Sequence, residues 1–74
     1  MNKIEIYTDE IQLDQFLKWA GIVDSGGQVK FMIQDKIIYL NDNLVTEKRK
    51  KIHNNDIITI KDIGCWQVLT KKGE

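Results

Sequence analysis

Proline is absent from this sequence, and cysteine and histidine each occur once. The single cysteine, Cys65, excludes an internal disulfide bond and a metal site built from several thiolates, and it is typical of proteins of a reducing cytosol. Long apolar runs are also missing, since the longest is Ile37-Ile38-Tyr39-Leu40. This length excludes a membrane-spanning helix, and the N-terminus shows no apolar signal region. We therefore expect a cytoplasmic protein with no membrane partner.

Motifs for catalysis are missing as well. The sequence contains no nucleophile elbow, phosphate-binding loop, dinucleotide fingerprint or paired-histidine metal motif. His53 lies next to a basic run, and we interpret it as a surface loop residue and not as a catalytic base. The carboxylates of Asp9, Glu10 and Asp14 flank a predicted helix start, where the helix dipole favours negative charge. We expect no enzymatic activity, no cofactor and no metal site.

The net charge is zero, but the charged residues are unevenly distributed along the chain. Residues 1–14 contain four acidic residues and one lysine, whereas residues 48–51 form an unbroken basic run, Lys48-Arg49-Lys50-Lys51. This segregation creates a local positive field that the total charge conceals. With 74 residues, of which 42% are hydrophobic, the chain builds one compact domain over residues 1–74 and has no room for a separate catalytic domain.

Apolar side chains at helical spacing mark the segment between residues 13 and 34. A first helix is predicted because one face of this segment carries Leu13, Phe16, Leu17 and Ala20 at helical spacing. Gly21 follows this face and should end the helix. Ser25 and Gln28 then form a capping-box signature in front of a second apolar face. This signature predicts a second helix from about Gly26 to Gln34.

Strand and turn signals occupy the rest of the chain. Short strands are predicted over residues 4–7, 38–40, 44–46, 57–61 and 65–69, where apolar or β-branched residues lie between turn-forming residues. The expected loops and turns are residues 8–10, Asn41-Asp42-Asn43, Asn54-Asn55-Asp56 and Gly64, with the basic run as a loop or strand end and residues 70–74 as a frayed tail. The predicted fold class is α+β, with two consecutive helices packed on a small, mainly antiparallel sheet.

Three features point to a surface for phosphate groups, and each also has a plainer explanation. The helix start Ser25-Gly26-Gly27-Gln28 offers backbone N–H groups behind small side chains, although ordinary capping explains the same pattern. Lys18 and Lys30 lie off the apolar helix faces, as most surface lysines do. The basic run is either a solvated charged loop or a phosphate-binding surface. Each feature is ambiguous when taken alone.

The two tryptophans receive different interpretations. Trp19 falls toward the side of the first predicted helix, where it either flanks a binding surface or covers the edge of the core. We favour the second interpretation. Trp66 lies in a predicted strand and is interpreted as a core residue.

The order and spacing of these features resemble the S-four domain family, whose fold is the alpha-L RNA-binding motif. The resemblance covers approximately residues 11–60 and includes Leu13-Asp14, Leu17, Gly21, Ser25, Leu40-Asn41 and Asp56-Ile57-Ile58. Residues 13–18 and 25–30 are similar to the small stand-alone bacterial members.

The resemblance implies a non-enzymatic module that binds structured RNA, either ribosomal or transfer RNA, in ribosome assembly or translation. A ribosomal subunit is then a further candidate partner, and a monomer is expected. RNA duplex is recognised mainly by shape, phosphates and 2′-hydroxyls, which suits a rigid helix pair with cations and amide donors. The implied RNA-binding residues are Lys18, Ser25, Gly26, Gln28, Lys30, Lys48, Arg49, Lys50 and Lys51.

The chain also departs from the family pattern. Gln12 and Gly26 stand where many members carry arginine, so two candidate phosphate contacts are missing. Lys36 and Asp42 occupy positions where turn glycines are usual, and Asn54-Asn55 replaces a glycine-containing turn. Asn and Asp adopt left-handed geometry readily, but Lys does so at greater cost.

The alternative function is that of a protein-interaction adaptor, which keeps the fold but not the affinity for RNA. The missing arginines and the zero net charge are compatible with it. An exposed apolar patch around Trp19 or Phe31 is the feature that would favour this alternative.

Overall fold

The computed structural model describes residues 1–71. Over these residues the elements are β1 (Asn2–Ile6), β2 (Glu10–Gln12), α1 (Leu13–Trp19), α2 (Gly26–Gln34), β3 (Ile38–Leu40), β4 (Asn43–Leu44), β5 (Lys51–His53), β6 (Ile57–Ile60) and β7 (Gly64–Thr70). The predicted α+β class with two consecutive helices is confirmed. Neither helix of residues 1–71 has the length and apolar character needed to cross a membrane.

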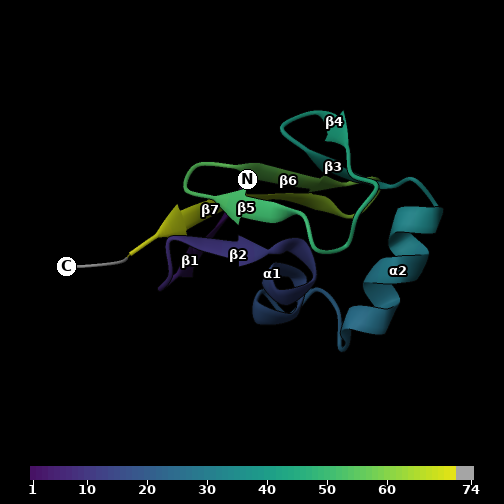
Figure 1. Cartoon of the computed structure of the whole chain (residues 1–74). Helices are drawn as coiled ribbons and strands as arrows, with labels where there is room; N and C mark the ends of the chain where they lie inside the picture. The colour runs from purple at the N-terminus through teal and green to yellow at the C-terminus, as the bar shows by residue number, and fades with distance from the viewer. Residues whose placement is uncertain (72–74) are drawn as a thin grey trace.

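The strands form two sheets. The larger sheet has the order β1-β7-β6-β3-β4, in which β1 is parallel to β7 and the other pairs are antiparallel. The smaller sheet consists of β2 and β5, which pair antiparallel with Ile11 opposite Ile52. Figure 1 shows β2 leading directly into α1, and α2 standing at one end of the molecule. The mainly antiparallel character of the sheet is therefore as predicted.

Local signals set the limits of both helices. The N–H of Gly21 donates to the carbonyl of Lys18 at 3.0 Å, and the positive φ of Gly21, 76°, ends the first helix as predicted. The capping box at the start of α2 is also present. Its Gln28 Oε1 accepts the N–H of Asp24 at 2.6 Å and that of Ser25 at 3.4 Å. Both helices therefore begin and end close to where their capping and periodicity signals place them.

One hydrophobic core joins the helices to both sheets. Phe16 and Leu17 of α1 and Val29 of α2 are fully buried, and they meet buried side chains from the strands. Trp66 is half-buried and packs against this core, in line with its interpretation. The buried hydrophobic residues are Ile6, Leu13, Phe16, Leu17, Val23, Val29, Ile38, Val45, Ile52, Ile58, Ile60 and Val68.

The observed strands correct three sequence-based predictions, two of which concern the small β2–β5 sheet. Glu10, expected in a loop, begins β2, and His53, also expected in a loop, lies in β5. The return strand expected over residues 44–46 is shorter, because β4 consists of Asn43 and Leu44 only. Glu10 and His53 are 43 positions apart in the sequence. Strands of three residues are too short to show a clear alternation, so only their long-range pairing reveals them.

The C-terminal prediction is wrong for the two residues of the tail that the structure describes. Thr70 belongs to β7, and its N–H donates to Asn54 Oδ1 at 2.9 Å. The N–H of Lys71 donates to the carbonyl of Ile6 at 2.9 Å, because β1 and β7 run side by side to this point. Residues 72–74, also expected to fray, lie outside the described residues.

Several turns contain residues other than glycine that adopt a positive φ. Lys36 has φ 58°, Asp42 has φ 71° and Asn55 has φ 70°, each in or next to a turn where the family resemblance expects glycine. The turns are therefore kept despite the substitutions. Asn and Asp tolerate this geometry, whereas a lysine pays a steric penalty of roughly 1–2 kcal/mol.

Replacing Lys36 by glycine is expected to raise the free energy of unfolding by about 1 kcal/mol, because glycine relieves the left-handed strain and loses only part of this gain to its larger unfolded-state entropy. Urea unfolding followed by circular dichroism measures the change. The matched control is Gly21→Ala at φ 76°, which should lower stability by a similar amount. A K36G protein no more stable than the parent would mean that the Lys36 side chain makes compensating contacts.

Candidate nucleic-acid interface

Main-chain hydrogen bonds fix the basic run against the start of α1. The N–H of Leu13 donates to the carbonyl of Lys50 at 2.8 Å, and the N–H of Asp14 donates to the carbonyl of Lys48 at 2.9 Å. The N-cap residue Gln12 makes no side-chain capping bond, so these carbonyls serve in its place. The basic run is therefore a fixed turn and not a loose loop.

The end of the basic run is held by strand pairing. Lys51 is the first residue of β5 and lies opposite Gln12, the last residue of β2. The next residue, Ile52, is fully buried in the core. Because β2 continues directly into α1, the same short stretch of backbone positions both the helix and the basic run.

The start of α2 lies next to the start of α1. A Cβ atom added at Gly26 would stand 3.8 Å from Asp14 Oδ2, so the Asp14 carboxylate faces this helix end. The other oxygen, Oδ1, accepts the N–H of Gln15 at 2.9 Å. Asp14 thus connects the first turns of the two helices with Lys48, whose carbonyl accepts its N–H. Its negative charge lies where the resemblance places a phosphate.

The capping box engages the polar groups of two predicted RNA-binding residues. The N–H of Ser25 donates to the Gln28 side chain, which also accepts the N–H of Asp24. These groups already have partners within the protein. Ser25 and Gln28 therefore set the direction of α2, and Lys30 follows Gln28 by two residues on the same helix.

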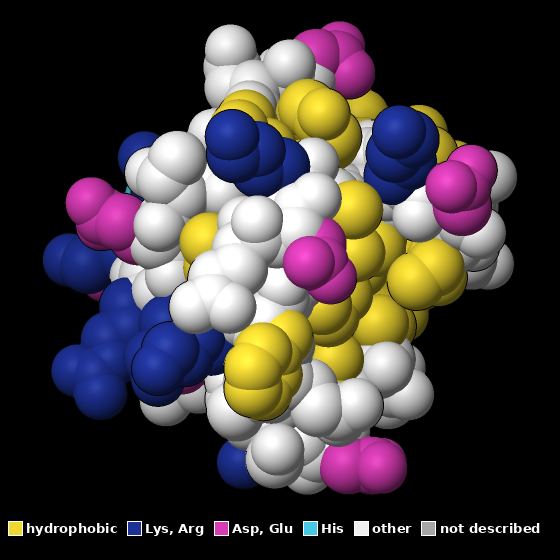
Figure 2. Space-filling model, turned by 90° about the vertical axis from the view of Figure 1, so that its right-hand side faces the viewer, with side chains coloured by type: hydrophobic (Ala, Val, Ile, Leu, Met, Phe, Trp, Pro, Cys, Tyr) yellow, Lys and Arg dark blue, Asp and Glu magenta, His cyan; other side chains and the backbone are white. Residues whose placement is uncertain are grey.

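A surface hollow brings α2 and the basic run together. Its volume is about 350 Å³, and its lining residues are Lys30, Ile33, Gln34, Thr46 and Lys48. Two predicted RNA-binding residues from different elements therefore border one depression. Figure 2, which looks onto the α2 end, shows Lys and Arg side chains gathered along one side of this face, next to an apolar area.

Most cations of this region carry no acidic partner. Within residues 1–71, the lysine salt bridges are Lys51 to Glu10 at 3.5 Å and Lys71 to Glu5 at 3.3 Å. No salt bridge within residues 1–71 involves Lys30, Lys48, Arg49 or Lys50. We call these residues the basic surface. Lys51 differs from them because Glu10 lies beside it.

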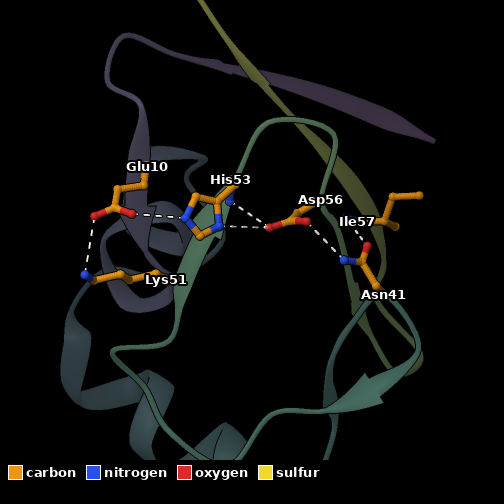
Figure 3. Close-up of polar contacts among 6 residues, drawn as sticks. All are labelled: Glu10, Asn41, Lys51, His53, Asp56 and Ile57. Atoms are coloured by element: carbon orange, nitrogen blue, oxygen red, sulfur yellow. Dashed lines mark hydrogen bonds and ion pairs between the residues drawn. The ribbon is translucent and has the colours of Figure 1, made fainter.

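A polar network borders the basic surface (Figure 3). The His53 Nε2 lies 3.0 Å from Glu10 Oε2, and the His53 N–H donates to Asp56 Oδ2 at 2.7 Å. The other Asp56 oxygen accepts Asn41 Nδ2 at 3.0 Å, and the Ile57 N–H donates to Asn41 Oδ1 at 2.9 Å. These contacts tie β5 to β2 and to the β3–β4 turn. No three His, Cys, Asp or Glu side chains in residues 1–71 are placed to hold a metal ion.

Sequence reasoning did not assign this network. It treated Asp56 as a turn residue and Glu10 as part of a helix start, and neither role depends on His53. A turn signal was present, since the Asn54-Asn55-Asp56 stretch is rich in residues that bond to nearby main chain. The partners across the sheets, however, come from segments that are distant in the sequence.

Lys18 is separated from the hollow of Lys30 and Lys48. It is exposed on α1 and borders a different depression, together with Ile11, Gln15 and Trp19. The predicted RNA-binding residues therefore form three groups: the basic run with Lys30, the capped start of α2, and Lys18 beside an exposed tryptophan.

Comparison with known proteins identifies the class of this domain. The chain matches the S4 domain family over residues 4–69 and belongs to it, which confirms the resemblance to the S-four pattern. It is also similar to a protein of Bacillus subtilis (strain 168) named "Probable ribosome maturation protein RlbA". The two sequences are 34% identical over 68 residues, which cover 92% of this chain and 96% of the relative.

Replacing Asp56 by alanine is expected to lower the free energy of unfolding by about 1–2 kcal/mol, because the His53 N–H and the Asn41 amide lose their acceptor. Chemical unfolding measures this loss. Asp35→Ala is the matched control, since Asp35 is exposed at the end of α2, where a carboxylate gains nothing from the helix dipole. Its change should stay within about 0.5 kcal/mol. Equal effects of the two substitutions would contradict a structural role for the network.

Proposed function

We propose that this protein binds structured RNA, with the basic surface as its main contact to the phosphates. The observation that carries this proposal is a set of cations that form no salt bridge within residues 1–71, on a turn fixed by main-chain bonds to α1. Membership of the S4 domain family supports RNA as the polymer. The protein then acts by binding RNA in the cytoplasm, without catalysis.

Rigidity is the physical reason why this surface suits folded RNA. Double-stranded RNA has a deep, narrow major groove that side chains do not read, so proteins recognise its shape and backbone. A turn whose carbonyls already bond to Leu13 and Asp14 loses little freedom when it binds, which lowers the entropic cost. Arg49 can contact one phosphate through two N–H groups, whereas the lysines act as point charges.

The residues of the site have different roles in this proposal. Lys30 and Lys48 contact backbone phosphates from the two sides of their shared hollow, and Arg49 and Lys50 extend this contact. Lys51 contributes less because Glu10 competes for it. The capped Ser25 and Gln28 orient α2. Gly26 contributes less to phosphate binding, because the Asp14 carboxylate faces it.

A ribosomal target is the finer part of the proposal. The relative from Bacillus subtilis carries ribosome maturation in its name, and the alignment covers nearly the whole of both chains. We therefore favour an element of ribosomal RNA over transfer RNA, with a role in the assembly of a ribosomal subunit.

Replacing residues 48–51 by four alanines is expected to abolish most RNA binding and to leave the fold intact, because alanine keeps the main-chain carbonyls that cap α1. Fluorescence anisotropy with a ribosomal RNA hairpin and a matched DNA duplex, over a salt titration, measures the change. The parent should prefer RNA and lose about 0.7–0.9 log units of affinity per log unit of salt for each phosphate contacted. Unchanged affinity in a folded variant would place the site elsewhere.

Single substitutions separate a free cation from a paired one. Lys50→Ala should reduce the salt slope by roughly one phosphate contact, about 0.7–0.9, whereas Lys51→Ala should reduce it by less than half of that. The reason is that Lys51 lies 3.5 Å from Glu10, whereas Lys50 forms no salt bridge within residues 1–71. The same anisotropy titration measures both slopes. Equal slopes for the two variants would show that the Glu10 pairing does not matter for binding.

A protein-interaction adaptor is the second candidate function. The observation in its favour is that Trp19 and Phe31 are 57% and 64% exposed, respectively. A folded protein that binds neither RNA nor DNA at low salt would favour this function. Phe31→Ser, which should leave RNA binding unchanged in the first proposal, would then be the variant to compare in a search for protein partners.

A further inference from the structure

Trp19 is an exposed aromatic side chain that the fold holds in one orientation. Its indole Nε1–H donates to the carbonyl of Glu5 in β1 at 2.8 Å, although 57% of the residue remains exposed. The Tyr7 ring stands almost perpendicular to it, at 82° and a centroid distance of 6.3 Å. The expectation that Trp19 mainly covers the core edge is thus only partly met, because much of the ring faces solvent.

The surroundings of Trp19 combine apolar surface with two lysines. Trp19 lines three surface hollows. The first is also lined by Ile11 and Lys18, the second by Ile6 and Tyr7, and the third by Lys3 and Ala20. Within residues 1–71, Lys3 and Lys18 form no salt bridge. The nearby Glu5 carboxylate is paired with Lys71 at 3.3 Å, which limits its repulsion of an anion.

We infer that an unpaired nucleobase of the bound RNA stacks on the Trp19 indole while Lys18 contacts an adjacent phosphate. This inference rests on the proposed RNA-binding function. A nucleotide carries a flat π-face and an anion together, which matches an aromatic ring next to a lysine that forms no salt bridge within residues 1–71. An apolar peptide side chain would use the ring but would leave Lys18 without a role.

The position of the hollow connects it to the basic surface. The basic run bonds to Leu13 and Asp14 at the start of α1, and Trp19 is the last residue of the same helix. At 1.5 Å per residue, Trp19 is about 9 Å along the helix axis from Leu13. One RNA molecule can therefore place paired nucleotides on the basic surface and a neighbouring unpaired base on Trp19.

Tryptophan fluorescence tests the stacking directly when Trp66→Phe removes the other tryptophan. The probes are a short hairpin RNA with an unpaired loop and a blunt duplex RNA with the same stem, both at low salt. We expect the hairpin to quench the Trp19 emission on binding, whereas the duplex should bind to the basic surface without quenching.

Two substitutions separate the aromatic face from the hydrogen bond to Glu5. Trp19→Phe and Trp19→Leu both lose the Nε1–H donor, but only W19F keeps a ring. W19F should bind the hairpin within about threefold of the parent, and W19L should bind it about 5- to 100-fold more weakly. Neither should change duplex binding by more than about twofold. Circular dichroism confirms that both variants are folded.

The outcomes distinguish this inference from the proposed function. If the folded parent binds neither RNA, the proposed function itself is wrong. If both RNAs bind but W19L and W19F affect them equally, or W19L has no effect, RNA binding stands and base stacking is wrong. If W19L weakens binding to intact ribosomal subunits but not to the hairpin, the ring contacts a protein, and the inference is overturned.

Discussion

The hydrogen bonds between the start of α1 and the carbonyls of Lys48 and Lys50 are the constraint on which the site depends. A helix of seven residues is too short to be stable alone, and no side chain caps its first turn. The basic run supplies the missing acceptors through its main chain. In return, α1 fixes the positions of the cations. One set of bonds thus builds both the helix and the candidate interface, and it uses only the main chain of the basic run.

The helices could be predicted from the sequence because their signals are local. Ser25 and Gln28 lie one helical turn apart, and the capping box they form is present where it was expected. The β2–β5 sheet could not be predicted in the same way. Each strand has three residues, and the partners Glu10 and His53 are separated by 43 positions. The fixed geometry of the basic run follows from this sheet, so the sequence identified its cations but not the surface they form.

The same difference between local and distant information applies to individual side chains. The sequence indicates that residues 48–51 are all cationic, but only the pairing of β2 with β5 places Glu10 beside Lys51. It also indicates that Trp19 lies off the apolar face of α1. The acceptor that orients the indole is a main-chain carbonyl of Glu5, and no pattern of residue types reveals such an acceptor. The charge and aromaticity of a side chain can therefore be predicted from the sequence. Whether that side chain is free to contact a ligand depends on the folded chain.

The hydrogen bond between Trp19 and Glu5 also affects the open edge of the larger sheet, where a strand of another molecule can pair. β1 is an edge of the larger sheet, and Lys71 bonds to the carbonyl of Ile6, so the neighbouring Glu5 carbonyl points away from β7 toward the open edge. Open edges recruit strands of other chains and lead to aggregation. The indole occupies an acceptor of this edge, and the opposite edge strand, β4, has only two residues. The Trp19 indole therefore removes one acceptor with which a strand of another molecule would otherwise pair.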